Sequence, residues 1–317
     1  MVHALVDPDI QPVDHLKQRV GDRFTVEVTA APDRDTLIDR LQDADLILTT
    51  SRHPIDRTVM EQTNLRLIGK FGTGVDSIDL EAAADLGIPV THTPGLNAKA
   101  VAEYTVMLAL AASRHLLQNV RLLERGGWRD ESASTGQVTD RTVGIVGFGR
   151  IGQRVAGLLS GFNVDVLASD PYVFEEDTDI TGAELTDLDD LLSRSDVVTI
   201  NAELTPETRG LIGADELALL SPDAYLVNTA RGPIVDEDAL VAALERGDLA
   251  GAALDVFETE PLPADSRLHG LDNVVATPHV AAMTKASRVR SVDRLIDNVI
   301  DLLDGEPVAD RYMAVPA

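Results

Sequence analysis

Short runs of apolar and β-branched residues alternate with stretches of helical periodicity along most of the chain. The first series predicts strands at 2–6, 24–28, 45–50, 66–70 and 88–91. The second series predicts strands at 142–147, 164–169, 196–200, 224–228, 250–254 and 274–276. Strands that are separated by helical lengths form parallel sheets. The pattern therefore predicts an α/β protein with two doubly wound sheets.

Two long helical stretches stand apart from this alternation. One runs from Ala98 to Glu124, between the turn-forming residues 94–97 and a pair of glycines at 126–127. Its middle, Val106–Ala112, is apolar on every side, which predicts burial in a core or against a second subunit. The other stretch spans 283–303 and ends at Asp304-Gly305-Glu306-Pro307. The acidic segment 175–190 has no such period, and we interpret it as a solvated loop.

Length and composition narrow the class of protein. A chain of 317 residues with 44% hydrophobic residues predicts two domains rather than one. It contains no cysteine, which excludes disulfides, thiolate metal sites and a cysteine nucleophile, and we expect no bound metal. No apolar run reaches the length of a membrane span, and the first residues do not have the pattern of a secretion signal. We therefore expect a cytoplasmic protein with no membrane partner.

The charge balance is strongly acidic. There are 53 acidic and 27 basic residues, for a formal net charge of −26, and only four of the cations are lysines. A polyanion such as nucleic acid would be repelled, so we expect no nucleic-acid partner. Many acids with few lysines resemble proteins of salt-accumulating halophiles, in which molar salt screens the self-repulsion. An ordinary acidic protein is the alternative.

A glycine-rich motif follows the strand at 142–147. The order is a strand, then Gly147-Phe148-Gly149-Arg150-Ile151-Gly152, then a helical segment. In such a motif Gly147 makes the tight turn, Gly149 lets a pyrophosphate approach the backbone, and Gly152 lets the helix pack on the strand. The motif in this context predicts a dinucleotide site; a simple tight turn is the alternative.

An acidic residue supports the dinucleotide interpretation. Asp170 ends the next strand, 18 residues past Gly152, where a ribose-binding carboxylate is expected. A carboxylate there favours NAD, because it would repel the 2′-phosphate of NADP. NADP stays open, since the neighbouring Ser169 is small and salt weakens the repulsion.

Three further segments carry residues that suit hydride chemistry. They are Val227–Gly232, Leu254–Pro261 and Thr277–Ala282. Together with the glycine motif, Gly72–Asp79 and Asn97–Glu103, they closely resemble the D-isomer-specific 2-hydroxyacid dehydrogenases. The resemblance covers most of the chain. It implies a Rossmann-type cofactor domain, 98–286, inserted in a flavodoxin-like substrate domain made of 1–97 and 287–317.

The resemblance implies three catalytic residues, and their chemistry fits. Arg231 is a planar cation that can bind a substrate carboxylate at two points and polarise the adjacent carbonyl. His279 titrates near neutral pH and can give or take the proton at the substrate oxygen. Glu260 would hold the imidazole in place and favour its charged form. Glu258 is the competing acid, and the Glu-Pro pair favours Glu260.

The same resemblance implies binding residues and a partner. The substrate carboxylate is expected at the backbone amides of Thr73 and Gly74, beside Arg231, with Arg52 as a further cation. Cofactor contacts are expected at Gly147, Gly149, Arg150, Ile151, Gly152, Asp170, Thr208, Thr229, Ala230 and Asp255. We expect a homodimer through the helix around Val106–Ala112.

Some positions depart from the family pattern. Asn201-Ala202-Glu203 stands where a His-Leu-Pro-like sequence is common, Ser169 replaces a common tyrosine, and Ala281-Ala282 replaces glycines. The first two border the adenosine half and bear on the choice of cofactor. Structural roles are expected for His3, His15, His115 and His269, whereas His53 and His92 are placed near the cleft.

The expected reaction is the reversible reduction of a small 2-oxo acid to the (R)-2-hydroxy acid. One alternative is a catalytically inactive, NAD(H)-sensing protein that resembles a corepressor. Another is a phosphoglycerate- or hydroxypyruvate-specific dehydrogenase of the same fold. Formate dehydrogenases share the fold but do not pair glutamate with histidine in this way.

Overall fold

The computed structural model describes residues 1–31, 33–50, 52–132 and 135–316. Its internal contacts divide the chain into two compact units. Unit 1 consists of Met1–Asn97 and Ala282–Ala317, and unit 2 consists of Ala98–Ala281. The division falls after Ala281, whereas the family resemblance implied a second boundary after residue 286.

Unit 1 is built on a six-stranded sheet. Its strands are β1 (Val2–Val6), β2 (Phe24–Val28), β3 (Leu46–Thr49), β4 (Leu67–Lys70), β5 (Val90–His92) and β13 (Met313–Val315). Their order is β2-β1-β3-β4-β5-β13, in which the first five are parallel and β13 is antiparallel to β5. The five parallel strands have the flavodoxin-like order.

Helices cover both faces of this sheet. They are α1 (Val13–Val20), α2 (Arg34–Leu41), α3 (Arg57–Glu61), α4 (Leu80–Asp85) and α12 (Lys285–Asp304). Side chains of α2, α3 and α4 share one buried cluster with the strands, and those of α1 and α12 share another. Strands that are buried on both faces explain why they are nearly continuous apolar runs in the sequence.

Unit 2 is built on a seven-stranded parallel sheet. Its strands are β6 (Thr142–Val146), β7 (Asp165–Ser169), β8 (Glu184–Leu185), β9 (Val197–Ile200), β10 (Tyr225–Asn228), β11 (Gly251–Leu254) and β12 (Val274–Ala276). Their order is β12-β11-β10-β9-β6-β7-β8. Starting from β6, the chain adds β7 and β8 on one side of the sheet and β9 to β12 on the other. The order of the strands therefore reverses between β6 and β9, which is the switch point where Rossmann domains bind their ligand.

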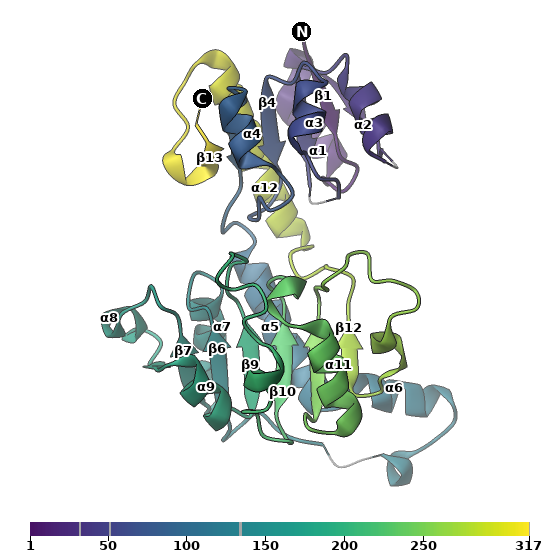
Figure 1. Cartoon of the computed structure of the whole chain (residues 1–317), viewed down its shortest axis with the longest axis vertical. Coiled ribbons are helices and arrows are strands. Elements are labelled where there is room, and N and C mark those ends of the chain that lie inside the picture. Colours follow the sequence, from purple (N-terminus) through teal and green to yellow (C-terminus); the bar gives the residue numbers. More distant parts are fainter. Residues whose placement is uncertain (32, 51, 133–134, 317) are drawn as a thin grey trace. The chain divides into compact units, whose positions relative to one another are not determined.

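Helices again cover both faces. They are α5 (Ala98–Ser113), α6 (Leu116–Glu124), α7 (Gly152–Leu159), α8 (Glu175–Thr178), α9 (Leu188–Arg194), α10 (Ala214–Leu217) and α11 (Glu237–Arg246). In Figure 1, α9 and α11 lie in front of the sheet and α5 lies behind it. Two separate buried clusters match these faces, one with α9, α10 and α11 and the other with α5 and α7.

The structure differs from the sequence pattern in two places in unit 2. The helix predicted over 98–124 is broken, because His115 takes a left-handed conformation with φ 49° between α5 and α6. The interpretation of 175–190 as a loop was wrong, since this segment contains α8, β8 and the start of α9. These elements are short and acidic, so their periodicity is weak.

The described part of the chain has no helix that is both long and apolar enough to span a membrane.

Candidate functional site

The glycine motif forms the turn between β6 and α7 at the switch point of unit 2. Gly147 has φ 87°, in the left-handed region that favours glycine, and a Cβ there would lie 2.5 Å from the backbone nitrogen of Ala202. A Cβ on Gly152 would lie 2.3 Å from the carbonyl oxygen of Gly147. By contrast, a Cβ on Gly149 would meet no atom within 4 Å, so this backbone is open to a ligand.

Asp170 closes the same edge from the end of β7. One carboxylate oxygen accepts a hydrogen bond from the backbone N–H of Phe148 at 2.8 Å, and the other accepts from the N–H of Tyr172 at 3.0 Å. The carboxylate is therefore held directly beside the glycine turn. This is the position that a ribose-binding acid needs.

The end of β9 adds an unsatisfied acceptor. The side-chain oxygen of Asn201 is buried without a hydrogen-bond partner, while its amide nitrogen donates to Thr199 Oγ1 at 2.9 Å. Buried polar atoms without a partner are rare in folded proteins and call for a ligand or water. Together with the open backbone at Gly149 and the fixed Asp170, this acceptor fits a dinucleotide at the switch point.

The backbone around Arg231 is held by Asn228, the last residue of β10. The side-chain oxygen of Asn228 accepts from the N–H of Ala230 at 3.0 Å, and its amide nitrogen donates to the carbonyl of Arg231 at 2.9 Å. Asn228 is 1% exposed. Asn228 was not among the residues expected at the site; an asparagine that begins a turn is the signal in the sequence that could have identified it.

Gly232 explains why the arginine segment and the glutamate segment lie together. A Cβ on Gly232 would lie 1.9 Å from the backbone carbon of Phe257. No side chain fits at that distance, so glycine permits the close backbone contact. Arg231 is thereby held against the segment that leads to Glu260.

His279 and Glu260 form an ion pair. Nδ1 of His279 lies 2.7 Å from Oε2 of Glu260, and Oε1 of Glu260 accepts from the N–H of Phe257 at 3.1 Å. The side chain of His279 is 43% exposed, and within the described residues no hydrogen bond to its Nε2 is found. Glu258 instead receives no contact from His279; its N–H donates to Glu237 at 3.1 Å.

The charges around Glu260 favour its ionised form. Burial acts to raise the pKa of Glu260, but the hydrogen bond and charge of His279, the N–H of Phe257 and the charge of Arg231 together lower this pKa below its ordinary value. The charge of Arg231 therefore acts on the same carboxylate that pairs with His279. Within unit 2, the carboxylate of Glu260 is thus influenced by the charges of both other predicted catalytic residues, His279 and Arg231.

Asp255 fastens the segment that carries His279. Its carboxylate is buried and accepts from Thr277 Oγ1 at 2.6 Å, from the N–H of Val280 at 2.9 Å and from the N–H of Ala281 at 2.8 Å. The backbone N–H of His279 also donates to the carbonyl of Asp255 at 2.9 Å. These bonds hold His279 in a left-handed conformation with φ 53°. The expected contact of Asp255 with a carboxamide stays a prediction.

The remaining expected cofactor residues lie on the same edge of unit 2. Thr229 is 7% exposed and shares a 2.7 Å hydrogen bond with Thr105 of α5. Thr208 donates to the carbonyl of Glu203 at 2.6 Å, which shapes the loop after β9. Arg150 and Ile151 lie between Gly149 and the first turn of α7. Their contacts with a cofactor stay predictions.

The expected substrate residues Thr73 and Gly74 lie in unit 1, in the loop after β4. The carbonyl of Thr73 lies 3.0 Å from Nδ1 of His92, and the hydroxyl of Thr73 donates to Asn97 Oδ1 at 3.3 Å. Within the described ranges, the backbone N–H groups of Thr73 and Gly74 donate no hydrogen bond to the protein. They are thus available to an anion.

Arg52, the other expected cation, is already paired within unit 1. Its guanidinium donates to Asp9 and lies 3.5 Å from Asp7, and the bond to Asp9 raises the pKa of Arg52 above its ordinary value. Binding of a substrate carboxylate by Arg52 would have to compete with these two acids.

The other histidines fall into two groups. Within the described residues, all four histidines expected to be structural make a side-chain contact in their own unit. His3 contacts the carbonyl of Asp43, His15 contacts Asp293, His115 contacts Tyr225, and His269 contacts the carbonyl of Pro263. His92 adjoins the Thr73 loop, and Nε2 of His53 is buried without a partner.

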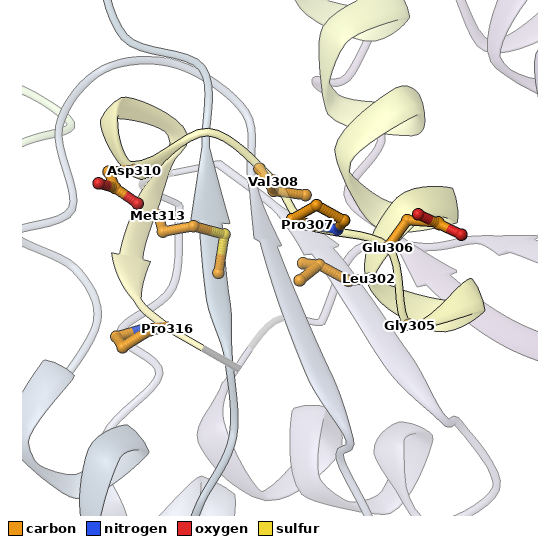
Figure 2. A pocket seen from close by; sticks show the side chains of 8 residues that line it. All are labelled: Leu302, Gly305, Glu306, Pro307, Val308, Asp310, Met313 and Pro316. Atoms are coloured by element: carbon orange, nitrogen blue, oxygen red, sulfur yellow. The ribbon is translucent and has the colours of Figure 1, made fainter.

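A cavity of about 470 Å³ lies elsewhere, between the end of α12 and β13 in unit 1. Figure 2 shows the apolar side chains of Leu302 and Met313 lining it, while the carboxylates of Glu306 and Asp310 point outward. None of its lining residues belongs to the candidate site, and they include no histidine, lysine or arginine. This cavity therefore offers no group for the expected chemistry.

Comparisons with known proteins agree with the geometry of unit 2. Residues 106–281 match the family described as D-isomer specific 2-hydroxyacid dehydrogenase, NAD binding domain. A glyoxylate reductase of Thermofilum pendens is 43% identical over 281 residues, which are 87% of this chain and 83% of the relative. A D-3-phosphoglycerate dehydrogenase of Methanocaldococcus jannaschii is 37% identical over 319 residues, 100% of this chain and 60% of the relative.

Solved structures give the same result for the fold. The NAD complex of a formate dehydrogenase from Staphylococcus aureus has a TM-score of 0.90 at 32% identity, and the comparison covers 100% of both chains. The chain spans only 60% and 56% of the length of two phosphoglycerate dehydrogenase relatives.

Unit 2 is a Rossmann sheet with a glycine turn and an acid at its switch point, and with an arginine, a glutamate and a histidine near its other strand ends. The family match over residues 106–281 includes all of these residues. The chain belongs to the D-isomer specific 2-hydroxyacid dehydrogenase family.

Proposed function

We propose that the chain is an NAD-dependent D-2-hydroxyacid dehydrogenase that reversibly reduces a small 2-oxo acid to the (R)-2-hydroxy acid. The observation that carries the proposal is the pairing of His279 with Glu260 at 2.7 Å under the charge of Arg231. A binding protein without turnover has no need for this arrangement. The family match and the glyoxylate reductase relative support the same chemistry.

Arg231 binds and polarises the substrate. Its guanidinium can hold the carboxylate at two points and draw electron density from the neighbouring carbonyl oxygen. Asn228 and Gly232 keep the backbone of this arginine fixed, so little reorganisation is needed when substrate binds.

His279 handles the proton. In reduction, Nε2 donates a proton to the substrate oxygen, and in oxidation it takes the proton back. Glu260 holds Nδ1 and stabilises the charged imidazole before the transfer. The nicotinamide, when bound, supplies or accepts the hydride.

The proposed cofactor is NAD rather than NADP. The carboxylate of Asp170 is held by two backbone N–H groups and cannot turn away from a ribose without losing them. A fixed negative charge disfavours a 2′-phosphate. NADP remains the alternative, because an imino acid reductase with 26% identity and a TM-score of 0.87 was solved with NADPH.

The substrate class has one specific alternative. The similarity to phosphoglycerate dehydrogenase relatives extends over 92–100% of this chain, so a phosphorylated 2-oxo acid is the second candidate. The two candidates are separated by a substrate panel. NADH oxidation is followed with glyoxylate, pyruvate, hydroxypyruvate and 3-phosphohydroxypyruvate, in dilute buffer and in molar KCl.

We expect turnover of at least one unphosphorylated 2-oxo acid by the wild-type protein and a loss of about 10²–10⁴-fold in His279→Ala. Turnover confined to the phosphorylated substrate would favour the second candidate. Binding of NADH without turnover of any 2-oxo acid would favour the sensing protein and sink the proposal.

We also propose a homodimer that forms through α5 and α6. Large apolar side chains are exposed along this part of unit 2: Met107, Leu116, Val120, Leu123 and Trp128 are 45%, 50%, 44%, 62% and 64% exposed. Several large apolar side chains exposed on neighbouring helices are typical of subunit contacts. Sedimentation should give a dimer that Leu123→Glu converts to monomer; a wild-type monomer would exclude it.

Finally, we propose adaptation to a salty cytoplasm. A net charge of −26 makes the folded state repel itself, and molar salt with a Debye length of about 3 Å removes that repulsion. The melting temperature should therefore rise as the KCl concentration increases from about 0.1 M to about 3 M. A melting temperature that falls or stays constant would remove the halophile proposal.

A further inference from the structure

A rigid turn follows the acid that closes the proposed nucleotide site. The N–H of Val173 donates to the carbonyl of Asp170 at 3.3 Å, and the N–H of Tyr172 donates to the carboxylate of Asp170 at 3.0 Å. Aspartate and proline at the first two positions favour such a turn, because proline presets the backbone and aspartate caps it. Tyr172 therefore has a fixed backbone position next to the Asp170 carboxylate.

The side chain of Tyr172 is unusually exposed. The chain has one Trp, four Tyr and six Phe. Among these side chains in the described residues Tyr172 has the highest exposure, 85%, and Phe174 follows with 71%. Val173 between them is partly buried against the core, so the two rings point away from it. Aromatic rings are enriched at binding surfaces, so two exposed rings beside a fixed turn indicate a contact surface.

We propose that Tyr172 is the platform for the adenine ring of the dinucleotide. The inference rests on the proposed function and extends it to a residue outside the glycine motif. The same carboxylate that would accept the ribose hydroxyls is bonded to the backbone of Tyr172. The adenine is attached directly to that ribose, so it must lie within a few ångströms of this turn.

The chemistry of the ring suits this role. Adenine is flat and weakly polar on its faces, and it stacks on aromatic side chains. The neighbouring side chains Glu175, Glu176, Asp177 and Asp179 are acidic. They would repel a phosphate but not the neutral adenine. The turn thus selects the base end of the dinucleotide rather than its pyrophosphate.

The test compares ligands that contain or lack the adenosine. Affinities of ADP-ribose and of reduced nicotinamide mononucleotide are measured by titration calorimetry for the wild-type protein and Tyr172→Ala. We expect Tyr172→Ala to weaken ADP-ribose about tenfold, within the range for loss of one stacked base, and to bind the mononucleotide as the wild type does. Tyr172→Phe keeps the ring and should recover most of the lost affinity.

A matched control lies in the same segment. Ile180 is 98% exposed and apolar, and Ile180→Ala should leave the affinity for ADP-ribose unchanged. An equal loss in this variant would point to a general change in the surface and overturn the assignment. Because Tyr172 is exposed, Tyr172→Ala should fold, which circular dichroism verifies.

The outcomes separate the inference from the proposed function. If the wild-type protein does not bind ADP-ribose, the proposed cofactor site itself is wrong. If it binds ADP-ribose and Tyr172→Ala binds equally well, only the role of Tyr172 is overturned. If Tyr172→Ala leaves ADP-ribose binding unchanged but alters the sedimentation of the protein, the ring contacts a second copy of the chain instead.

Discussion

Nδ1 of His279 lies 2.7 Å from Oε2 of Glu260, although the two residues come from different strand ends and His279 has a left-handed backbone with φ 53°. The contact therefore depends on two separate supports: the bonds from Asp255 to the histidine segment, and the N–H of Phe257 on the glutamate. A substitution that weakens either support should therefore disturb the pair.

Removing the charge of Glu260 should change how stability depends on pH. Its native pKa is lowered, so the ionised carboxylate stabilises the folded state fully above the ordinary glutamate pKa of about 4.3, and this stabilisation is lost as the pH falls through the lower native pKa. Glu260→Gln should be less stable than wild type at pH 7 by up to about 1 kcal/mol, since the pair is partly exposed. Urea unfolding at several pH values measures this difference.

As the pH falls below about 4, the difference between wild type and Glu260→Gln should shrink, because the carboxylate becomes protonated in the folded state. Glu258→Gln is the matched control, because Glu258 is exposed and does not contact His279. A difference that grows as the pH falls below about 4 would contradict the lowered pKa of Glu260.

Replacing Arg231 by lysine should separate charge from geometry. Lysine keeps the positive charge but cannot bind a carboxylate at two points, so kcat/KM for the 2-oxo acid should fall about 10²–10³-fold. Steady-state kinetics measures the loss, and NADH affinity should change little. Arg246→Lys alters an exposed pair with Asp248 and serves as the control. Equal kinetics for Arg231→Lys and wild type would remove the bidentate role.

A methyl group at Gly232 should be far more damaging than one at Gly157. The Cβ of Gly232→Ala would overlap the backbone of Phe257 at 1.9 Å, so the two segments must separate, at a cost of about 1–3 kcal/mol or more. Gly157 is exposed in α7 with no atom within 4 Å of its Cβ. Gly157→Ala should be neutral or stabilising by up to about 1 kcal/mol.

Thermal unfolding of both variants, with kcat for those that fold, checks this contrast. A Gly232→Ala protein with wild-type stability and activity would show that the backbone contact with Phe257 is dispensable.

Exchanging Asp170 for serine should shift the choice of cofactor. Without the carboxylate, the 2′-phosphate of NADPH meets no fixed negative charge, so the ratio of kcat/KM for NADPH to that for NADH should rise about 10²-fold. Asp165→Ser, at the exposed start of the same strand, should leave the ratio unchanged. If both variants shift it equally, the net charge of the surface rather than Asp170 decides the preference.

The fold was largely predictable from the sequence, for a physical reason. The parallel strands are buried on both faces, so each is a short, nearly continuous apolar run that stands out from the helices around it. The antiparallel β13 was missed because it has three residues and lies beside a proline. The break between α5 and α6 at His115 was not predicted, because no glycine or proline marks it in the sequence.

The candidate site was predictable in residue type but not in geometry. The sequence shows Arg231, Glu260 and His279, yet nothing local predicts the left-handed conformation of His279 or the contact of Gly232 with Phe257. Pairing of Arg52 with Asp9 was also not foreseen, because the two are distant in sequence and meet only when β1 and β3 lie side by side.

The three hydrogen bonds that Asp255 accepts make the conformation of segment 277–281 depend on a carboxylate outside it, at the end of the neighbouring strand. Transplanting this segment between relatives would succeed only if the recipient has a carboxylate in the same position at the end of the strand that corresponds to β11. Anyone who redesigns the histidine loop must therefore treat two stretches, twenty-odd residues apart, as one module.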